Sequence, residues 1–380
     1  MRKLIIVVNE DRFFLSHRKD IALRAQAEGF DVTIVCKDTG RSHEVQSLGF
    51  SMIELPINPT GMNLKEELKT LFFLWKLYRG QKPDIVHHVG LKTILWGGIA
   101  AKLSKVPGVV NAVCGLGVLF SGEKPSFVAR SVMRVMAWSN AGKNVREIFQ
   151  NADDIKLFKT YGVVTEEQCC FVKGSGVDLE DFYYVPEPSE GKIRVIFTAR
   201  MVKEKGTITL IEAAEKLRGE FGKKAEFLLC GDLSNNPNGI KKEELEARCD
   251  GVYLQWLGFR RDVRDLLMAS HIMAFPSYYR EGVPLSLIEA CAAGRPIVTC
   301  DSIGCRDTVD DSVNGFLIPP RDSDALAEKL RVLFLDKSLR EAMGRKSREK
   351  AEKEFSLKIV VDKHLEVYHL LESMAEERND

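Results

Sequence analysis

The sequence predicts an α/β protein made of two doubly wound, Rossmann-like domains that face each other across a cleft. Three observations support this fold class. Short apolar runs alternate with amphipathic helical stretches along the chain, as in parallel sheets joined by helical crossovers. A length of 380 residues is long for one core and suits two domains. A segment rich in Pro, Gly and acidic residues, 178–192, interrupts the alternation and is expected to be a linker.

The first half, residues 1–178, is expected to form an N-terminal, Rossmann-like domain. Its apolar runs predict strands at residues 4–8, 32–36, 51–55, 85–89, 109–113, 146–150 and 170–173. Helical periodicity between several of these runs predicts helices at residues 18–28, 64–78, 93–103 and 152–161.

The second half, residues 192–356, is expected to form a second α/β domain by the same alternation. Strands are predicted at residues 194–198, 226–230, 253–256, 272–275 and 297–300. Helices are predicted at residues 208–217, 243–248, 263–268, 285–292, 324–335 and 339–354. A last amphipathic helix, about 357–380, is expected to pack back on the N-terminal domain. Doubly wound sheets bind ligands beyond the carboxyl ends of their strands, which places the site at the cleft.

Composition excludes several classes of protein. A hydrophobic content of 45% and a charged content of 29% are those of a soluble globular chain. The formal net charge of +1 argues against a strongly basic nucleic-acid binder, so no nucleic-acid partner is expected. The nine cysteines are scattered, without zinc spacing. No apolar run is long enough for a signal peptide or a membrane span, which favours a cytoplasmic protein.

Two glutamates, Glu281 and Glu289, flank the segment that is most informative about function. Pro284 suits the first turn of a helix, so Glu281 is expected on the preceding loop and Glu289 on the helix. The free amides near Leu285 and Ser286 then form an anion site. Carboxylates beside a bare phosphate would repel it, whereas they would accept hydrogen bonds from hydroxyl groups that flank it. A nucleotide-sugar has hydroxyl groups on both sides of its diphosphate.

Two cations follow the first strand of the second half. Arg200 and Lys205 lie at a strand end before Gly206, and a helix is predicted to start there. This position favours neutralisation of a diphosphate, by a forked contact from Arg200 and a point charge on Lys205. The alternative is two solvated surface charges.

Two further motifs have simpler explanations. Gly174 and Gly176, at the end of the first half, allow a close backbone approach, and an ordinary turn explains them equally well. Asp322 and Asp324 resemble a metal-binding DxD pattern, but a capping residue before the helix at 324–335 explains them fully. No metal and no cofactor are therefore predicted.

Three histidines lie near predicted strand ends: His17, His87 and His88. A histidine at such an edge is a candidate catalyst, although packed or capping histidines are more common. Ser16 is expected to cap the helix that follows His17.

The segment of about 124–146 has only basic charges and an apolar face at helical spacing. This pattern predicts an amphipathic helix that contacts an anionic membrane surface, or an ordinary helix packed on the first domain. Its charged residues are Lys124, Arg130, Arg134, Lys143 and Arg146.

These motifs resemble those of family 4 retaining glycosyltransferases of the GT-B fold. The likeness rests on the Glu-x7-Glu segment that ends at Glu289, the segment that begins at Arg200, and the glycine segment at 174–178. It extends over nearly the whole chain. The run 13–18 and the loop at Gly115 further resemble bacterial members that extend polyprenol-diphosphate-linked glycans, of the N-acetylgalactosaminyltransferase type.

The resemblance implies that residues 1–178 form the acceptor-side domain and residues 192–356 the nucleotide-sugar-binding domain. It also implies a role for each site residue. Glu281 contacts donor-sugar hydroxyls and Glu289 holds the ribose, while Arg200 and Lys205 bind the diphosphate. Many members have a catalytic-site histidine where this chain has a cysteine at 114, so His17 is the candidate substitute. The remaining residues expected at the donor site are Gly282, Val283, Pro284, Leu285, Ser286 and Gly176.

The expected function is the transfer of a sugar from a nucleotide-sugar, UDP-linked HexNAc or hexose, to a lipid-linked or polysaccharide-precursor acceptor. The enzyme is expected to be metal-independent and cytoplasmic, peripheral on the inner face of the membrane. Two alternatives remain open at this stage: a non-catalytic nucleotide-sugar-binding subunit of a glycan-assembly complex, and a sugar-nucleotide epimerase of the same fold.

Overall fold

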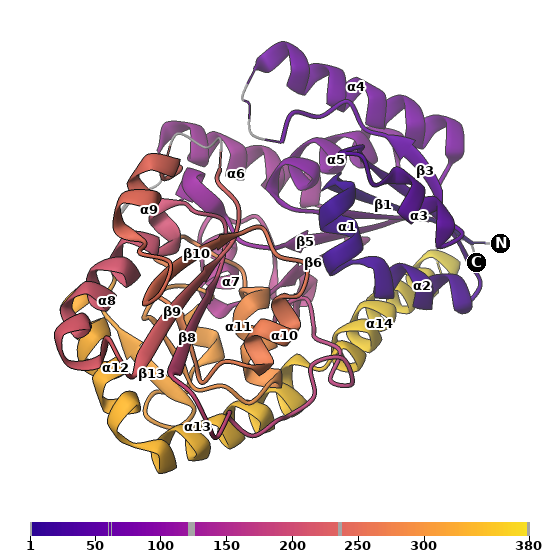
Figure 1. The fold of residues 1–380 in the computed structure, drawn as a ribbon. Helices are drawn as coiled ribbons and strands as arrows, with labels where there is room; N and C mark the ends of the chain where they lie inside the picture. The colour runs from indigo at the N-terminus through magenta and orange to yellow at the C-terminus, as the bar shows by residue number, and fades with distance from the viewer. Residues whose placement is uncertain (1, 60, 62, 121–125, 235–237, 378–380) are drawn as a thin grey trace. The chain divides into compact units, whose positions relative to one another are not determined.

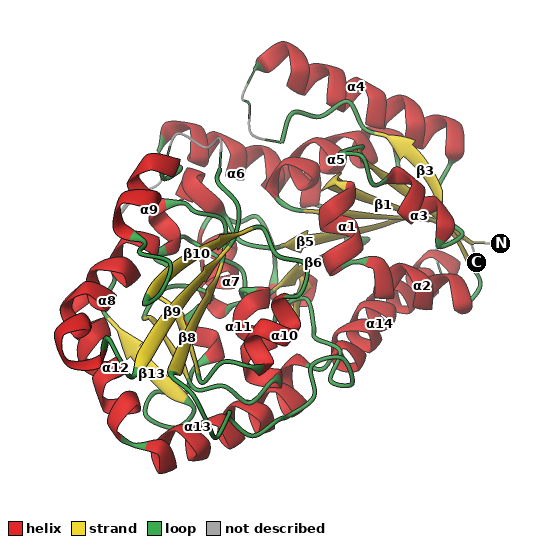
Figure 2. Ribbon diagram, in the orientation of Figure 1, coloured by secondary structure: helices red, strands yellow, loops and turns green. Residues whose placement is uncertain are grey.

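The computed structural model describes residues 2–59, 61, 63–120, 126–234 and 238–377, which divide into two α/β units (Figure 1). Unit 1 comprises Met1–Ser175 and Lys358–Asp380, and unit 2 comprises Gly176–Leu357. In each unit helices flank one parallel sheet (Figure 2). The two parallel-sheet domains expected from the sequence are therefore confirmed.

Unit 1 has a seven-stranded sheet in the order β3-β2-β1-β4-β5-β6-β7, and neighbouring strands are parallel. Every residue of β4, β5 and β6 is buried, because helices cover both faces of the sheet centre. The strands are β1 (Arg2–Glu10), β2 (Phe30–Lys37), β3 (Ser51–Glu54), β4 (Ile85–Val89), β5 (Gly108–Val113), β6 (Val145–Phe149) and β7 (Cys169–Phe171).

The helices of unit 1 include two short ones that the sequence pattern did not predict, α1 and α3. The full set is α1 (Asp11–His17), α2 (Lys19–Ala27), α3 (Ser42–Ser47), α4 (Leu64–Gln81), α5 (Leu91–Ser104), α6 (Phe127–Asn140), α7 (Ala152–Thr160) and α14 (Leu357–Glu376). The expectation that Ser16 caps the helix after His17 was wrong. Ser16 lies inside α1, and its hydroxyl donates to the carbonyl of Arg12, four residues earlier (2.8 Å).

Helix α14 belongs to unit 1 although it follows unit 2 in the chain. The Tyr368 hydroxyl bonds with Nδ1 of His87 on β4 (2.6 Å), and His369 contacts Glu28 at the end of α2 (2.8 Å). Figure 1 shows α14, in yellow, beside α2. The last helix of the chain thus covers part of the unit 1 sheet, whose first strand, β1, is formed by the first described residues.

Unit 2 has a six-stranded parallel sheet in the order β10-β9-β8-β11-β12-β13. Its strands are β8 (Ile193–Thr198), β9 (Ala225–Cys230), β10 (Leu254–Gly258), β11 (Ile272–Phe275), β12 (Ile297–Cys300) and β13 (Gly315–Ile318). Its helices are α8 (Thr207–Phe221), α9 (Lys242–Arg248), α10 (Val263–Met268), α11 (Leu285–Ala292), α12 (Ser323–Leu335) and α13 (Lys337–Lys350).

Three details of unit 2 bear on the expectations. The Asp322 side chain accepts from the Ala325 amide (2.8 Å), which confirms that it caps α12. The segment 178–192, expected to be a linker, packs on unit 2, where Glu187 forms a two-bond ion pair with Arg340 (2.8 Å each). Pro284 lies one residue before α11 with ψ 125°, rather than in its first turn.

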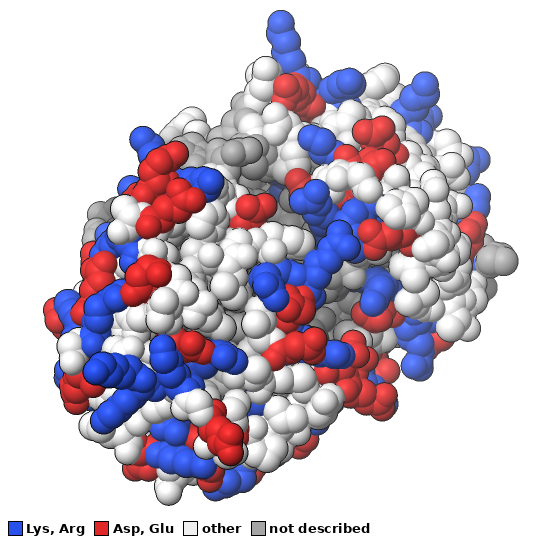
Figure 3. All heavy atoms as spheres, viewed as in Figure 1, with Lys and Arg blue, Asp and Glu red and all other residues white. Residues whose placement is uncertain are grey.

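Charges of both signs are interspersed over unit 2 on the face shown in Figure 3, in keeping with the near-zero net charge. Within the described ranges, no helix has the length and apolar character needed to cross a bilayer.

Candidate active site

The predicted donor residues gather at one edge of unit 2. Strands β8, β11 and β12 are adjacent and parallel, so their carboxyl ends meet. After β8 comes a 3-10 turn, Lys203–Lys205, and after β11 comes the loop that leads to α11. The sheet order therefore brings together residues that lie about 80 positions apart in the chain.

Lys205 and Glu281 form an ion pair at this edge, and both side chains are mostly buried (18% and 13% exposed). The Lys205 ammonium also lies over the rings of Phe275 (5.5 Å) and Tyr279 (5.4 Å). Ser277 Oγ donates to the same Glu281 oxygen (3.3 Å). The aromatic faces stabilise this cation, and limited solvent strengthens its electrostatic interactions.

The carbonyl of Glu204 fixes the 3-10 turn to the loop after β11. It accepts hydrogen bonds from the amides of Tyr278 (2.9 Å) and Tyr279 (3.1 Å) and from the Ser277 hydroxyl (3.2 Å). Lys205 is the next residue in the turn, so these bonds set the position of its backbone. The loop that holds Glu281 is held by the same junction.

Two glycines let backbone segments approach each other closely at the site. Gly206, at φ 81°, lies against Pro276, and an added Cβ would sit 2.1 Å from the Pro276 carbonyl oxygen. Gly304, at φ 83°, lies against Gly282, where an added Cβ would sit 1.6 Å from the carbonyl oxygen. Neither position has room for a side chain, and both backbone conformations favour glycine.

The start of α11 presents backbone donors at this edge. The amides of Leu285 and Ser286 bond to no acceptor among the described residues, while those of Leu287 and Ile288 bond to the Pro284 carbonyl. Because Pro284 has no side-chain hydrogen-bonding group, the cap leaves both donors available. Such amides and the positive end of the helix dipole favour an anion.

Glu289 lies on the next turn of α11 and is half-buried. Its carboxylate has no hydrogen-bond or ion-pair partner in the described part of the chain, in contrast to Glu281. Burial raises the pKa of Glu289 to about 7. The carboxylate is therefore placed to gain a hydrogen-bond donor from a ligand.

Arg200 occupies the loop between β8 and the 3-10 turn. The neighbouring Met201 and Val202 form bridges with Leu233 and Gly239, which fix the backbone of this loop. The Arg200 side chain is exposed and contacts no carboxylate of the described residues. It can therefore turn toward an anion without breaking an existing pair.

In unit 1, His17 ends α1 at the carboxyl edge of the sheet. Its Nδ1 bonds with Ser16 Oγ (2.6 Å), and its ring stacks on Phe13 (centroids 4.2 Å apart). Burial and the adjacent Arg18 lower the pKa of His17 to about 3. The ring is thus neutral near pH 7, so it can bond with a hydroxyl group but does not supply a positive charge.

Arg18, beside His17, is a further candidate residue, to which no role was assigned from the sequence. Its guanidinium is buried (2% exposed) and donates to the His17 carbonyl (2.8 Å), Cys114 Sγ (3.0 Å) and Ser175 Oγ (3.5 Å). It pairs with no carboxylate among the described residues. The only signal was its position beside His17, because Cys114 and Ser175 are distant in sequence.

The other histidine candidates are structural. Nδ1 of His87 bonds with Tyr368, and His88 lies between Tyr78 (2.9 Å) and Asn111 (2.8 Å). Both are fully buried, and burial lowers the pKa of His88 to about 4. Gly176, expected near the donor, is buried with φ 82°.

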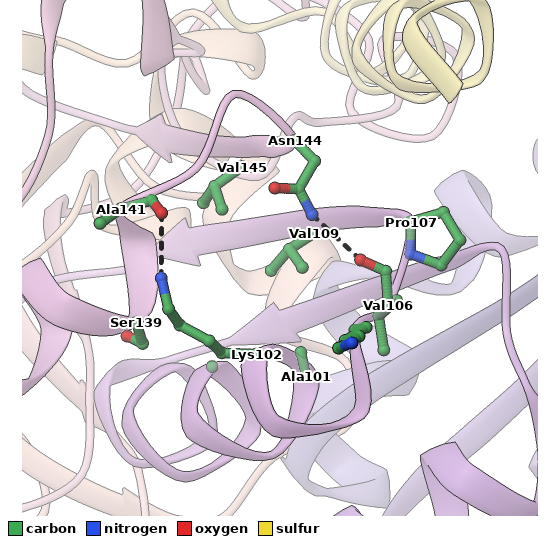
Figure 4. Close-up of a pocket in the computed structure, with 11 residues that line it drawn as sticks. Ala101, Lys102, Val106, Pro107, Val109, Ser139, Ala141, Asn144 and Val145 are labelled. Carbon is green, nitrogen blue, oxygen red and sulfur yellow. Dashed lines mark hydrogen bonds between the residues drawn. The ribbon is translucent and has the colours of Figure 1, made fainter. Parts of the chain in front are cut away.

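A separate cavity of about 260 Å³ lies in unit 1, between α5, α6 and the starts of β5 and β6 (Figure 4). Lys102 donates to the Ala141 carbonyl (2.9 Å) and Asn144 to the Val106 carbonyl (3.0 Å). Because Val109 and Val145 are the second and first residues of β5 and β6, the cavity lies at the amino edge of the unit 1 sheet and is not part of the candidate site. No three His, Cys, Asp or Glu side chains of the described residues cluster as metal ligands would.

Two family models match consecutive parts of the chain. The family described as "Glycosyl transferase 4-like" matches residues 3–150, and "Glycosyl transferases group 1" matches residues 184–350. The second match contains Arg200, Lys205, Glu281 and Glu289.

Relatives with known functions cover nearly the whole chain. It is 26% identical over 352 residues to the N,N'-diacetylbacillosaminyl-diphospho-undecaprenol alpha-1,3-N-acetylgalactosaminyltransferase of Campylobacter jejuni, covering 89% of this chain and 90% of that protein. It is 27% identical over 367 residues to the UDP-Gal:alpha-D-GlcNAc-diphosphoundecaprenol alpha-1,3-galactosyltransferase of Escherichia coli, covering 90% and 89%.

Similar solved structures extend the likeness to the fold. The Anabaena protein Alr3699/HepE, in complex with UDP, has a TM-score of 0.78 at 17% identity and covers 97% of this chain and 100% of that one. Sucrose-phosphate synthase of Thermosynechococcus elongatus has a TM-score of 0.79 at 19% identity, covering 98% and 100%. These likenesses confirm the fold class predicted from the sequence.

Proposed function

Because this chain is a glycosyltransferase of the GT-B fold, we propose that it transfers a sugar from a UDP-sugar to a polyprenol-diphosphate-linked acceptor with retention of configuration. The strongest support comes from one edge of the unit 2 sheet. Lys205, Glu281, Glu289 and the free amides of α11 lie together there. The two alternatives, a non-catalytic subunit and an epimerase, are not favoured, because the matched families and named relatives are glycosyltransferases.

The residues divide between the two ends of the donor. Lys205, Arg200 and the amides of Leu285 and Ser286 bind the diphosphate. Glu281 accepts hydrogen bonds from the donor sugar, and Glu289 accepts them from the ribose. This division places cations and amides beside phosphate, and carboxylates beside hydroxyl groups.

The reaction breaks the bond between the anomeric carbon and the β-phosphate oxygen, and forms a bond from that carbon to the acceptor oxygen. The acceptor hydroxyl proton goes to the departing phosphate oxygen on the same face, and UDP leaves. Negative charge on the diphosphate grows as the bond breaks, and fixed donors aimed at it stabilise the transition state. We propose that Arg200 and Lys205, rather than a metal ion, supply this stabilisation.

The acceptor class comes from the relatives. Both relatives named above act on sugars linked to undecaprenol diphosphate, according to their names. The basic face of α6, with Arg130 and Arg134, supports contact with an anionic membrane surface where such acceptors reside. Lys124, the first basic residue of the expected membrane segment, lies outside the described residues.

The test is sugar transfer by the purified chain from UDP-HexNAc or UDP-hexose to a polyprenol-diphosphate-linked sugar. Lys205→Ala and Arg200→Ala are expected to lower kcat by about 10²–10³-fold, the usual cost of one transition-state donor. Lys216→Ala is the matched control, because Lys216 is a half-exposed cation of unit 2 that pairs with Asp324 on the surface. Near-normal turnover in both site variants would refute the diphosphate assignment, and turnover of donor without acceptor would favour the epimerase.

A further inference from the structure

A large apolar groove crosses unit 1, with α5 as its floor and α4 and α6 as its walls. It encloses about 650 Å³. Helix α5 packs against both α4 and α6, and Figure 2 shows the three helices on the same side of the sheet. The groove is lined mainly by aliphatic and aromatic side chains, among them Leu91, Leu95, Trp96, Ile99, Val132 and Val135.

Several large apolar residues of the groove are exposed. Phe127 and Leu64, at its mouth, are 72% and 67% exposed, and Val128 and Val135 along α6 are 48% and 38% exposed. Phe72 on α4, outside the groove lining, is also 62% exposed. Soluble proteins seldom expose a contiguous apolar surface of this kind unless something binds it.

The charges inside the groove satisfy each other. Glu67 pairs with Lys92 (2.5 Å) and also accepts from the indole N–H of Trp96. Lys92 donates further to the carbonyl of Asn58 (2.7 Å). The floor therefore offers little hydrogen bonding to a sugar or a nucleotide, and a hydrocarbon fits its chemistry better.

The two helices that wall the groove also carry exposed cations outside its lining. Lys65 and Lys69 on α4 and Arg130 and Arg134 on α6 are exposed, and none pairs with a carboxylate of the described residues. An apolar channel between two helices that carry unpaired cations is complementary to an amphiphile that joins a hydrocarbon chain to an anionic head.

The groove opens at the edge of the sheet that carries His17 and Arg18. In a parallel sheet, each crossover helix begins near the carboxyl end of the strand before it. Leu64, Leu91 and Phe127 are the first residues of α4, α5 and α6, so all three lie toward this edge. A hydrocarbon chain bound in the groove would therefore have its head group at the carboxyl edge of the sheet, where an acceptor sugar must lie.

We infer that the groove binds the isoprenoid chain of the lipid-linked acceptor, next to its diphosphate. The inference rests on the proposed function for the identity of the lipid. It adds a binding site for the hydrocarbon, separate from the donor residues of unit 2.

The test uses the full chain and soluble probes: farnesyl diphosphate, inorganic diphosphate, and vesicles of neutral or anionic phospholipid. Wild type is expected to bind farnesyl diphosphate at least about tenfold more tightly than inorganic diphosphate, because the farnesyl chain buries apolar surface in the groove. The double variant Val128→Glu, Val135→Glu places charges on exposed groove positions and is expected to lose this preference. Leu370→Glu on α14 is the matched control, because Leu370 is an equally exposed apolar residue (44%) outside the groove.

A second variant separates charge from shape. Ser131→Trp fills the groove without adding charge, and is expected to lose farnesyl binding as well. Thermal melts check that each variant folds. In the transfer assay, both groove variants should raise the KM for the polyprenyl acceptor about tenfold or more and leave the KM for the donor unchanged.

Several outcomes would overturn the inference. One such outcome is that the groove variants bind farnesyl diphosphate as tightly as wild type does. Another is that Leu370→Glu loses as much farnesyl diphosphate affinity as the groove variants lose. If wild type bound anionic vesicles but showed no preference for the isoprenoid, the surface would be a membrane contact and not a chain-binding groove. Failure of the proposed function looks different, since no sugar would be transferred while isoprenoid binding and its loss in the variants remained.

Discussion

The ammonium of Lys205 lies against the carboxylate of Glu281, and a donor diphosphate at this edge would compete for the same cation. The motif predicted that Lys205 and Glu281 belong to one site, but it did not predict their direct contact. Binding of the diphosphate would draw the ammonium toward phosphate and leave Glu281 to accept from sugar hydroxyls and from Ser277. Donor binding would thus replace the Lys205–Glu281 ion pair with a contact from Lys205 to phosphate and contacts from Glu281 to sugar hydroxyls.

If Glu289 holds the ribose as proposed, donor binding depends on pH. With its pKa at about 7, the carboxylate is about half protonated near neutrality and must ionise to accept from two ribose hydroxyls. Because binding favours the ionised form, the affinity for UDP is expected to rise up to about tenfold between about pH 6 and pH 8. Isothermal titration of UDP at several pH values measures this rise.

The variant Glu289→Gln is the control for this prediction, because the ionisation of UDP itself also changes with pH. The variant should bind UDP more weakly than wild type and keep only the pH dependence that belongs to the nucleotide. Equal pH dependence in the two proteins would exclude Glu289 as the titrating group.

At the scale of elements, the loop 301–305 after β12 supports the Glu281 loop through backbone contact at Gly304. Gly304→Ala would place a methyl group against the Gly282 carbonyl, so Gly282 and Glu281 would have to move. Displacement of a reacting-group contact by about 1 Å costs about 10²-fold in rate. Kinetics of sugar transfer should show this loss, together with a lowered free energy of unfolding of about 1–3 kcal/mol.

Gly251→Ala separates backbone strain from steric contact. Gly251 has a similar φ of 72°, but no atom lies within 4 Å of its added Cβ. It should lose stability through strain alone and keep normal turnover. A turnover loss of the same size in both variants would mean that Gly304 has no special relation to the site.

The sequence predicted best those elements whose apolar runs end at turn residues. The strands β11 and β12 and the helices α10 and α11 have the predicted bounds. It missed α1, because seven residues of mixed aromatic and polar character show too little periodicity. It also missed β13, a short edge strand in which Gly315 lies against the Ile297 carbonyl.

The contacts of the candidate site were less predictable than its members. The Lys205–Glu281 pair depends on β11 being the neighbour of β8, which is a property of sheet order and not of local pattern. The buried Arg18 depends in the same way on Cys114 and Ser175, each contributed by a different part of the chain. Motif spacing identifies residue types, whereas tertiary folding determines which of them touch.

At the scale of the whole molecule, α14 couples the end of the chain to the centre of unit 1. Tyr368→Phe removes the only hydrogen bond to Nδ1 of the buried His87 in the described structure, at an expected cost of about 1–3 kcal/mol. The melting temperature of unit 1 should fall by about 2–4 °C per kcal/mol. Calorimetry with and without UDP measures the change.

His369→Ala on the same helix is the matched control. Its side chain is 46% exposed and pairs with Glu28 and Glu372 at the surface, where such pairs contribute about 1 kcal/mol or less. The stabilisation by UDP, whose proposed site is in unit 2, should be unchanged in both variants. A smaller loss for Tyr368→Phe than for His369→Ala would contradict the assigned role of the buried bond.

The return of α14 to unit 1 also has a consequence for synthesis on the ribosome. Unit 1 begins with the first residues, but its sheet lacks one covering helix until Lys358–Asp380 has been translated. At roughly 5–20 residues per second, translation of unit 2 takes about 10–40 s. During this interval the surface that α14 later buries, including His87 and Phe30, is open to solvent and to chaperones. The second unit in the sequence can therefore finish folding before the first, so the order of folding need not follow the order of translation.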